Sequence, residues 1–95
     1  MAVKVILKRK VPKDKEQDLL PLLLELRGKA MRQPGYISGE TLRSMDSPEE
    51  LVVIGTWQSK EAWEKWASSK ERAEIQERID SLLGEKTECN VYYYG

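Results

Sequence analysis

Three tryptophans carry most of the chemical information in this chain. Trp57, Trp63 and Trp66 lie within ten residues of one another, in a 95-residue sequence that contains neither Phe nor His. Large aromatic side chains at the point where a strand leads into a helix either anchor a core or line a small-molecule pocket. Histidine is the usual acid–base group near neutral pH, so a pocket here has to work without an imidazole.

The cysteine and charge counts exclude other chemistry. Cys89 is the only cysteine, so we expect neither an intramolecular disulfide nor a cysteine-based zinc site. Lys+Arg and Asp+Glu both number 16, and zero net charge argues against a generic nucleic-acid binder. No apolar run approaches the ~20 residues of a membrane span and no signal peptide is visible, so we expect a cytoplasmic protein. We also expect that it binds no metal.

Hydrophobic periodicity predicts the elements that position these groups. Alternating or apolar runs predict strands over 2–11, 36–45, 51–58 and 86–94. Helical spacing predicts helices over 13–32, 59–67 and 68–83. Pro21 favours a kink in the first helix, which we expect to begin near Asp14. Ser59 is a plausible cap of the second helix, Ser68 opens a capping-box pattern for the third, and Gly84 is placed to end it.

The order βαββαβ predicts one domain over residues 1–95 with a ferredoxin-like α+β fold, a four-stranded antiparallel sheet with both helices on one face. The third strand is apolar on both alternating faces, and Ile6 and Ile37 add to the face that two helices cannot cover. We therefore predict a closed homodimer through the open sheet face. The tyrosines at 92–94 are expected to pack at the edge where the subunits meet.

Three stretches resemble the antibiotic biosynthesis monooxygenase family. Pro34-Gly35-Tyr36 stands at the entry to the second strand, Trp57 ends the third, and WQSKEAWEKWASS forms the step into the next helix. The resemblance covers nearly the whole chain in element order. It implies a dimeric α/β barrel and, by analogy with one branch, oxidation of small phenolic, quinol or anthrone rings by O2 without a cofactor.

Another branch of this family degrades heme with a histidine ligand, a pocket tryptophan and an asparagine in the first strand. Trp66 matches the tryptophan, but Gln76 stands where the histidine belongs, and Ile6 or Leu7 where the asparagine belongs. Two of the three residues are missing. We therefore expect no conventional heme degradation and place the chain near the quinol and anthrone branches.

A cofactor-independent oxygenase needs a dry site that holds the ring and stabilises its anion. The candidate substrate-binding residues are aromatic walls, cations and hydrogen-bond donors: Trp66 and Tyr36, Arg43 and Arg72, and Gln76 with Tyr92 or Tyr94. The base is either a carboxylate with a raised pKa (Glu40 or Glu88) or a tyrosinate beside an arginine. Alternatively, the substrate is acidic enough to need no base. The catalytic residues stay unassigned.

Other interpretations stay open. The chain is alternatively a non-catalytic barrel that binds a small apolar or aromatic ligand, or a structural dimer, and a further alternative is heme binding without histidine. Trp57 and Trp63 are assigned mainly to packing. Lys8-Arg9-Lys10 is interpreted as a solvated strand end.

Overall fold

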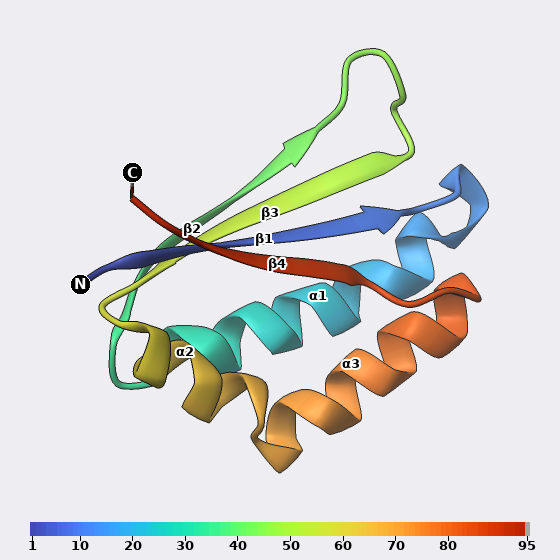
Figure 1. The fold of residues 1–95 in the computed structure, drawn as a ribbon. Helices are drawn as coiled ribbons and strands as arrows, with labels where there is room; N and C mark the ends of the chain where they lie inside the picture. Colours follow the sequence, from blue (N-terminus) through green and yellow to red (C-terminus); the bar gives the residue numbers. More distant parts are fainter. Residues whose placement is uncertain (95) are drawn as a thin grey trace.

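A computed structural model describes residues 1–94 and shows a twisted sheet with helices on one of its faces (Figure 1). The elements in chain order are β1 (Val3–Lys10), the 3-10 turn η1 (Lys13–Lys15), α1 (Glu16–Met31), β2 (Tyr36–Arg43), β3 (Glu50–Trp57), α2 (Lys60–Ala67), α3 (Lys70–Leu83) and β4 (Glu88–Tyr93). The strands pair antiparallel in the order β2-β3-β1-β4. The ferredoxin-like βαββαβ prediction is confirmed.

The first helix begins later than its acidic residues indicate. Lys13–Lys15 form the 3-10 turn, and α1 starts at Glu16 instead of near Asp14. Pro21 therefore lies in the second turn, where its missing N–H removes one backbone hydrogen bond. Leu19 and Leu26 are the buried residues of α1 and direct this helix onto the core.

Two serines divide the segment after β3 into two helices. Ser59 caps α2, because its Oγ accepts a hydrogen bond from the Ala62 N–H at 3.1 Å. Ser69 is extended, with φ −70° and ψ 148°, and its Oγ accepts from the Arg72 N–H at 3.2 Å. The cap of α3 is thus Ser69, which corrects the capping box predicted from Ser68. Gly84 ends α3 at φ 74° in the left-handed region, as predicted.

Strand register separates a face covered by helices from an open face. On the covered face Val3, Val5 and Leu7 of β1 lie opposite Trp57, Gly55 and Val53 of β3. On the open face Ile6 lies opposite Ile54, and Lys4 Nζ donates to Thr56 Oγ1 at 2.7 Å. All three α-helices lie on the other side of the sheet (Figure 1).

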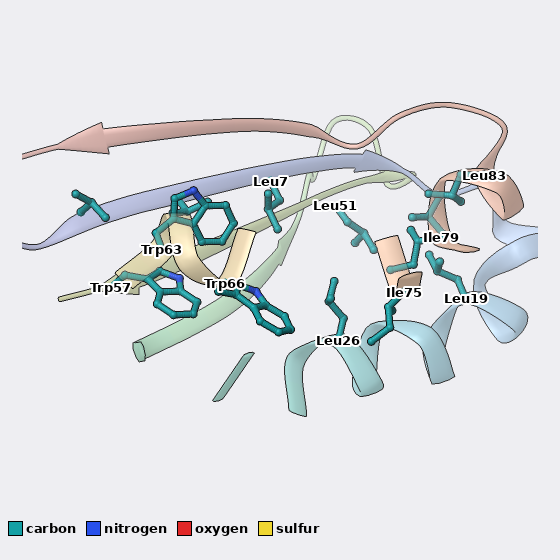
Figure 2. Packing of buried hydrophobic residues seen from close by; sticks show 13 residues of the cluster. Leu7, Leu19, Leu26, Leu51, Trp57, Trp63, Trp66, Ile75, Ile79 and Leu83 are labelled. Carbon is teal, nitrogen blue, oxygen red and sulfur yellow. The ribbon is translucent and has the colours of Figure 1, made fainter. Parts of the chain in front are cut away.

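The core lies between the covered face and the helices. At one end Ile75 and Ile79 of α3 pack near Leu19 of α1, and at the other the three tryptophans gather (Figure 2). Ile79 is fully buried, and Ile75 and Leu19 are each 1% exposed. The sheet and α3 thus supply a tightly packed end, next to which the tryptophan end opens into a cavity.

Candidate functional site

A cavity of about 430 Å³ lies between the covered face of the sheet and the helices. Its volume falls in the range of small-molecule sites. The buried part of its lining comes from β1, β3 and α2, with Val5, Leu7, Leu51 and the three tryptophans among its residues, and from Leu26 of α1. The exposed lining residues belong to α1 and the edge strand β2, so the mouth of the cavity lies between these two elements.

Four aromatic side chains line the cavity. Tyr36 meets Trp57 edge to face, with ring centroids 5.4 Å apart and planes at 90°. Trp57 in turn meets Trp63 at 5.7 Å and 66°. Trp63 and Trp66 lie one helical turn apart on α2, and Figure 2 shows them beside Trp57. Trp57 and Trp63 therefore pack as predicted, and also line the cavity together with the predicted Trp66 and Tyr36.

Two glycines let the rings of Tyr36 and Trp57 lie across the sheet. Gly39 and Gly55 face each other in the β2–β3 register, and both line the cavity. A Cβ on Gly39 would lie 2.7 Å from the Tyr36 hydroxyl, and one on Gly55 would lie 3.5 Å from Trp57 Nε1. The rings thus occupy the space that two strand side chains would fill, and they form an aromatic floor.

Arg9 lies at the buried part of the cavity and is only 5% exposed. Its Nε donates to Thr87 Oγ1 at 3.1 Å, and its Nη2 donates to Gln76 Oε1 at 3.2 Å. Burial lowers the pKa of Arg9 to about 10, against a smaller raising effect from Asp80. The interpretation of Lys8-Arg9-Lys10 as a solvated strand end is therefore wrong for Arg9, because its side chain continues the covered face after Val5 and Leu7.

Arg72 is the second cation among the inner residues of the cavity. Its guanidinium carbon lies 5.2 Å from the centroid of Trp63, a cation–π contact. Burial lowers the pKa of Arg72, while Cys89 and Asp80 act in the opposite direction. Arg72 thus lies against an aromatic ring of the cavity lining, while its role as an anion stabiliser stays a prediction.

Arg43 marks the mouth of the cavity. Its Nη1 lies 2.7 Å from Glu16 Oε1 and donates to the Pro48 carbonyl at 2.6 Å. Both members of this ion pair are largely exposed, so the pair adds little stability. Glu40, one of the predicted bases, borders the mouth and is exposed, but its register with Ile54 places its side chain on the open face.

Gln76 and the other predicted donors do not line the cavity. The Gln76 amide donates to Asp80 Oδ1 at 2.9 Å and to Thr87 Oγ1 at 2.7 Å. Its Oε1 accepts from Arg9, so Gln76 positions Arg9 without lining the cavity itself. Tyr92 lies opposite Lys4 and therefore on the open face of the sheet, where it is 50% exposed.

The remaining candidates lie outside the cavity as well. Tyr94 is exposed, with the Lys4 ammonium 6.0 Å from its ring centroid. Glu88, the second predicted base, pairs in register with Lys8 on the open face. Within residues 1–94, no group of three or more His, Cys, Asp or Glu side chains is placed to hold a metal ion. No helix in the same range has the length and apolar character to cross a membrane.

The comparisons with known proteins agree with the fold. The family model described as antibiotic biosynthesis monooxygenase matches residues 2–78. No curated protein matches the sequence. A conserved protein from Methanosarcina mazei Go1 superposes with a TM-score of 0.90 at 23% identity, over 100% of this chain and 94% of that one.

Two further solved structures are similar. Rv0793 from Mycobacterium tuberculosis gives a TM-score of 0.85 at 21% identity, over 100% of this chain and 96% of that one. SnoaB, a cofactor-independent oxygenase from Streptomyces nogalater, gives 0.81 at 15% identity, over 99% and 93%. At these identities the similarity extends to the fold.

Proposed function

Since the chain belongs to the antibiotic biosynthesis monooxygenase family, we propose that it is a cofactor-independent monooxygenase acting on a small phenolic or quinol-type ring. The observation that carries the proposal is the cavity of about 430 Å³, which has an aromatic floor, the buried Arg9 and the partly buried Arg72. The solved oxygenase SnoaB has the same fold. The branch of the family nearest to this chain is, in our proposal, the quinol and anthrone oxygenases.

The proposed reaction requires the protein to bind the ring compound and to stabilise the negative charge of its anion. A ring hydroxyl or an acidic ring CH2 loses a proton, and the resulting anion transfers one electron to O2. The two radicals combine into a ring peroxide anion. This anion takes up a proton to give the hydroperoxide, which loses water. One ring CH2 and one O2 thereby become one ring C=O and one water. The aromatic walls exclude water, and Arg72 stabilises the anion in a site of low dielectric.

In this reaction no side chain acts as the base. The substrate is acidic enough to lose its proton to solvent. Glu40 is the only acidic residue that borders the cavity within residues 1–94, and its register with Ile54 places its side chain on the open face of the sheet. A cation beside the ring hydroxyl lowers the hydroxyl's pKa, so the proton leaves to solvent through the mouth. The apparent pKa of kcat/KM should therefore follow the pKa of each substrate instead of staying constant across substrates.

Oxygen uptake with a panel of quinols and anthrones tests the proposal. We expect consumption by the unaltered protein, a reduced rate in Trp66→Phe and a near-complete loss in Trp66→Ala. Tyr92→Phe is the control, because its phenol lies on the open face, and it should leave the rate unchanged. Circular dichroism checks that each variant is folded. No uptake above the Trp66→Ala rate with any substrate would contradict the proposal.

The lack of a buried carboxylate or imidazole favours one other function, a barrel that binds a small aromatic ligand without converting it. The two functions differ in the fate of the ligand. If mass spectrometry recovers a bound ring compound unchanged after incubation in air, the protein binds and does not oxidise that compound.

We also propose a homodimer through the open face of the sheet. Ile6 and Ile54 lie opposite each other there and are only half-buried in one chain. A second copy would cover them with the same surface, as two-fold symmetry requires. Sedimentation at micromolar concentration should give twice the 11.0 kDa chain mass, and a monomer would contradict this proposal.

A further inference from the structure

Arg9 is a buried cation without a carboxylate beside it. It is 5% exposed, and its two hydrogen bonds go to neutral oxygen atoms of Thr87 and Gln76. None of the ion pairs among residues 1–94 includes Arg9. A buried charge normally has a charged partner, because leaving water without one is costly. The fold alone therefore leaves Arg9 incompletely compensated.

Asp80 is the nearby carboxylate, but it makes no ion pair with Arg9. Its Oδ1 accepts hydrogen bonds from the Gln76 amide, the Thr87 N–H and the Thr87 hydroxyl, at 2.9, 3.1 and 2.8 Å. Asp80 thus acts on Arg9 through Gln76 and Thr87 and does not touch the guanidinium. These contacts fix the orientation of Arg9 while one of its terminal nitrogens, Nη1, makes no hydrogen bond within residues 1–94.

Arg72 adds a second positive charge to the lining of the same cavity. It lies in the first turn of α3, where the helix dipole disfavours a cation. Helix stability therefore does not explain this arginine. The two guanidinium groups are close enough for Arg72 to lower the pKa of Arg9. With two cations and one carboxylate, this part of the cavity has an uncompensated positive charge.

We propose that the cavity selects ring compounds that carry an oxyanion, and that this oxyanion binds between Arg9 and Arg72. The oxyanion is either a carboxylate on the ring or an ionised ring hydroxyl, since both offer charged oxygen acceptors to a guanidinium. The apolar and aromatic lining holds the ring itself. The inference rests on the proposed function in that it names the substrate class of the same cavity, but it concerns binding and does not require O2.

Calorimetric titration with a matched pair of ligands tests the inference. 2-Naphthoate and 2-naphthamide have the same ring and nearly the same shape, but only the first is charged. We expect the unaltered protein to bind 2-naphthoate at least tenfold more tightly. Equal affinities, or tighter binding of the amide, would overturn the inference, and this comparison needs no variant.

Arg72→Gln and Arg78→Gln locate the effect. Both variants remove one cation from α3, but Arg78 is exposed and pairs with Glu25 at 3.7 Å, away from the cavity. Arg72→Gln should lower the affinity for 2-naphthoate tenfold or more and change that for 2-naphthamide by less than twofold. Arg78→Gln should change neither. If Arg72→Gln weakens both ligands equally, the anion does not bind at this arginine and the inference fails.

A titration with 2-naphthol separates the two sources of the oxyanion. Above pH 5, 2-naphthoate stays ionised and its binding should not change between pH 6 and pH 9. If an ionised hydroxyl also binds, the affinity for 2-naphthol rises with pH towards the naphthol's own pKa. A constant, weak affinity for 2-naphthol restricts the class to ring carboxylates.

The outcomes also separate this inference from the oxygenase proposal. If 2-naphthoate is selected but no quinol or anthrone consumes O2, the oxygenase proposal fails and the binding inference stands. If the unaltered protein consumes O2 with quinols but binds 2-naphthamide as well as 2-naphthoate, the oxygenase proposal stands and the binding inference fails.

Discussion

Replacing Arg9 by methionine should leave the stability of the ligand-free protein almost unchanged, although it removes two hydrogen bonds. Burial lowers the pKa of Arg9 to about 10. One pKa unit corresponds to about 1.4 kcal/mol, so keeping Arg9 charged costs the folded state about 3 kcal/mol. This value already includes the attraction of Asp80. Arg9→Met removes this cost and also loses two hydrogen bonds donated by a charged group, worth about 1.5 kcal/mol each. The two effects nearly cancel, so we expect the free energy of unfolding to change by less than about 1 kcal/mol.

The pH dependence follows from the same lowered pKa. At pH 7 Arg9 is charged in both the folded and the unfolded chain, so the full cost is present. It decreases as the pH rises through about 10, the folded pKa, towards the higher pKa of the unfolded chain. The effect of Arg9→Met on the free energy of unfolding should therefore be constant between pH 6 and pH 9. Urea unfolding at one fixed protein concentration measures it, with Arg78→Met as the control on an exposed arginine.

Ligand should make the unaltered protein the more stable of the two. At a concentration 100 times its Kd, a ligand that binds only the folded state adds about 2.7 kcal/mol. The unaltered protein should gain this from 2-naphthoate, and Arg9→Met should gain much less. A loss of 2 kcal/mol or more in ligand-free Arg9→Met, with Arg78→Met unchanged, would refute the reasoning. Arg9 would then be a structural residue held by its hydrogen bonds, and not a cation kept for a ligand.

Three further predictions concern local structure. Ser69→Ala should destabilise the protein by about 1 kcal/mol in urea unfolding because it removes the cap of α3, whereas Ser68→Ala should have a smaller effect, since this hydroxyl makes no cap. Gly35→Ala should lower the free energy of unfolding by about 2 kcal/mol or more, because Gly35 has φ 91° and an added Cβ would lie 2.5 Å from a side chain of α2. Burial raises the pKa of the Cys89 thiol above 9.0, while Arg72 and Arg9 lower it. The pH profile of alkylation by iodoacetamide should therefore have its midpoint above 9.0, and Arg72→Gln should move this midpoint higher.

The elements were predictable because each has its own local signal. Period-two alternation marks β1, and Ser59 and Gly84 mark helix ends through backbone hydrogen bonds that span a few residues. The start of α1 was predicted too early, since the acidic residues that favour a helix N-terminus also occur in a 3-10 turn.

The candidate site was predictable only in part. A signal for Arg9 existed, because it continues the alternation of Val5 and Leu7, but the flanking lysines made the cluster resemble a solvated end. Tyr92 was misplaced because its neighbours Val91 and Tyr93, not Tyr92, share the covered face. The bonds of Gln76 depend on Thr87, which lies 11 residues away and meets it only after α3 turns back into β4.

Gly39 and Gly55 of the aromatic floor affect the size of the ring that fits the cavity and not the charge that the ring carries. Gly55 has room for a methyl group, since the nearest atom to an added Cβ lies 3.5 Å away, whereas the same change at Gly39 would displace the hydroxyl of Tyr36. Neither position touches Arg9 or Arg72. Ring size and ring charge are therefore encoded at different places in the chain. Descendants of this sequence could adapt to narrower rings through one substitution in β3 and keep their preference for charge.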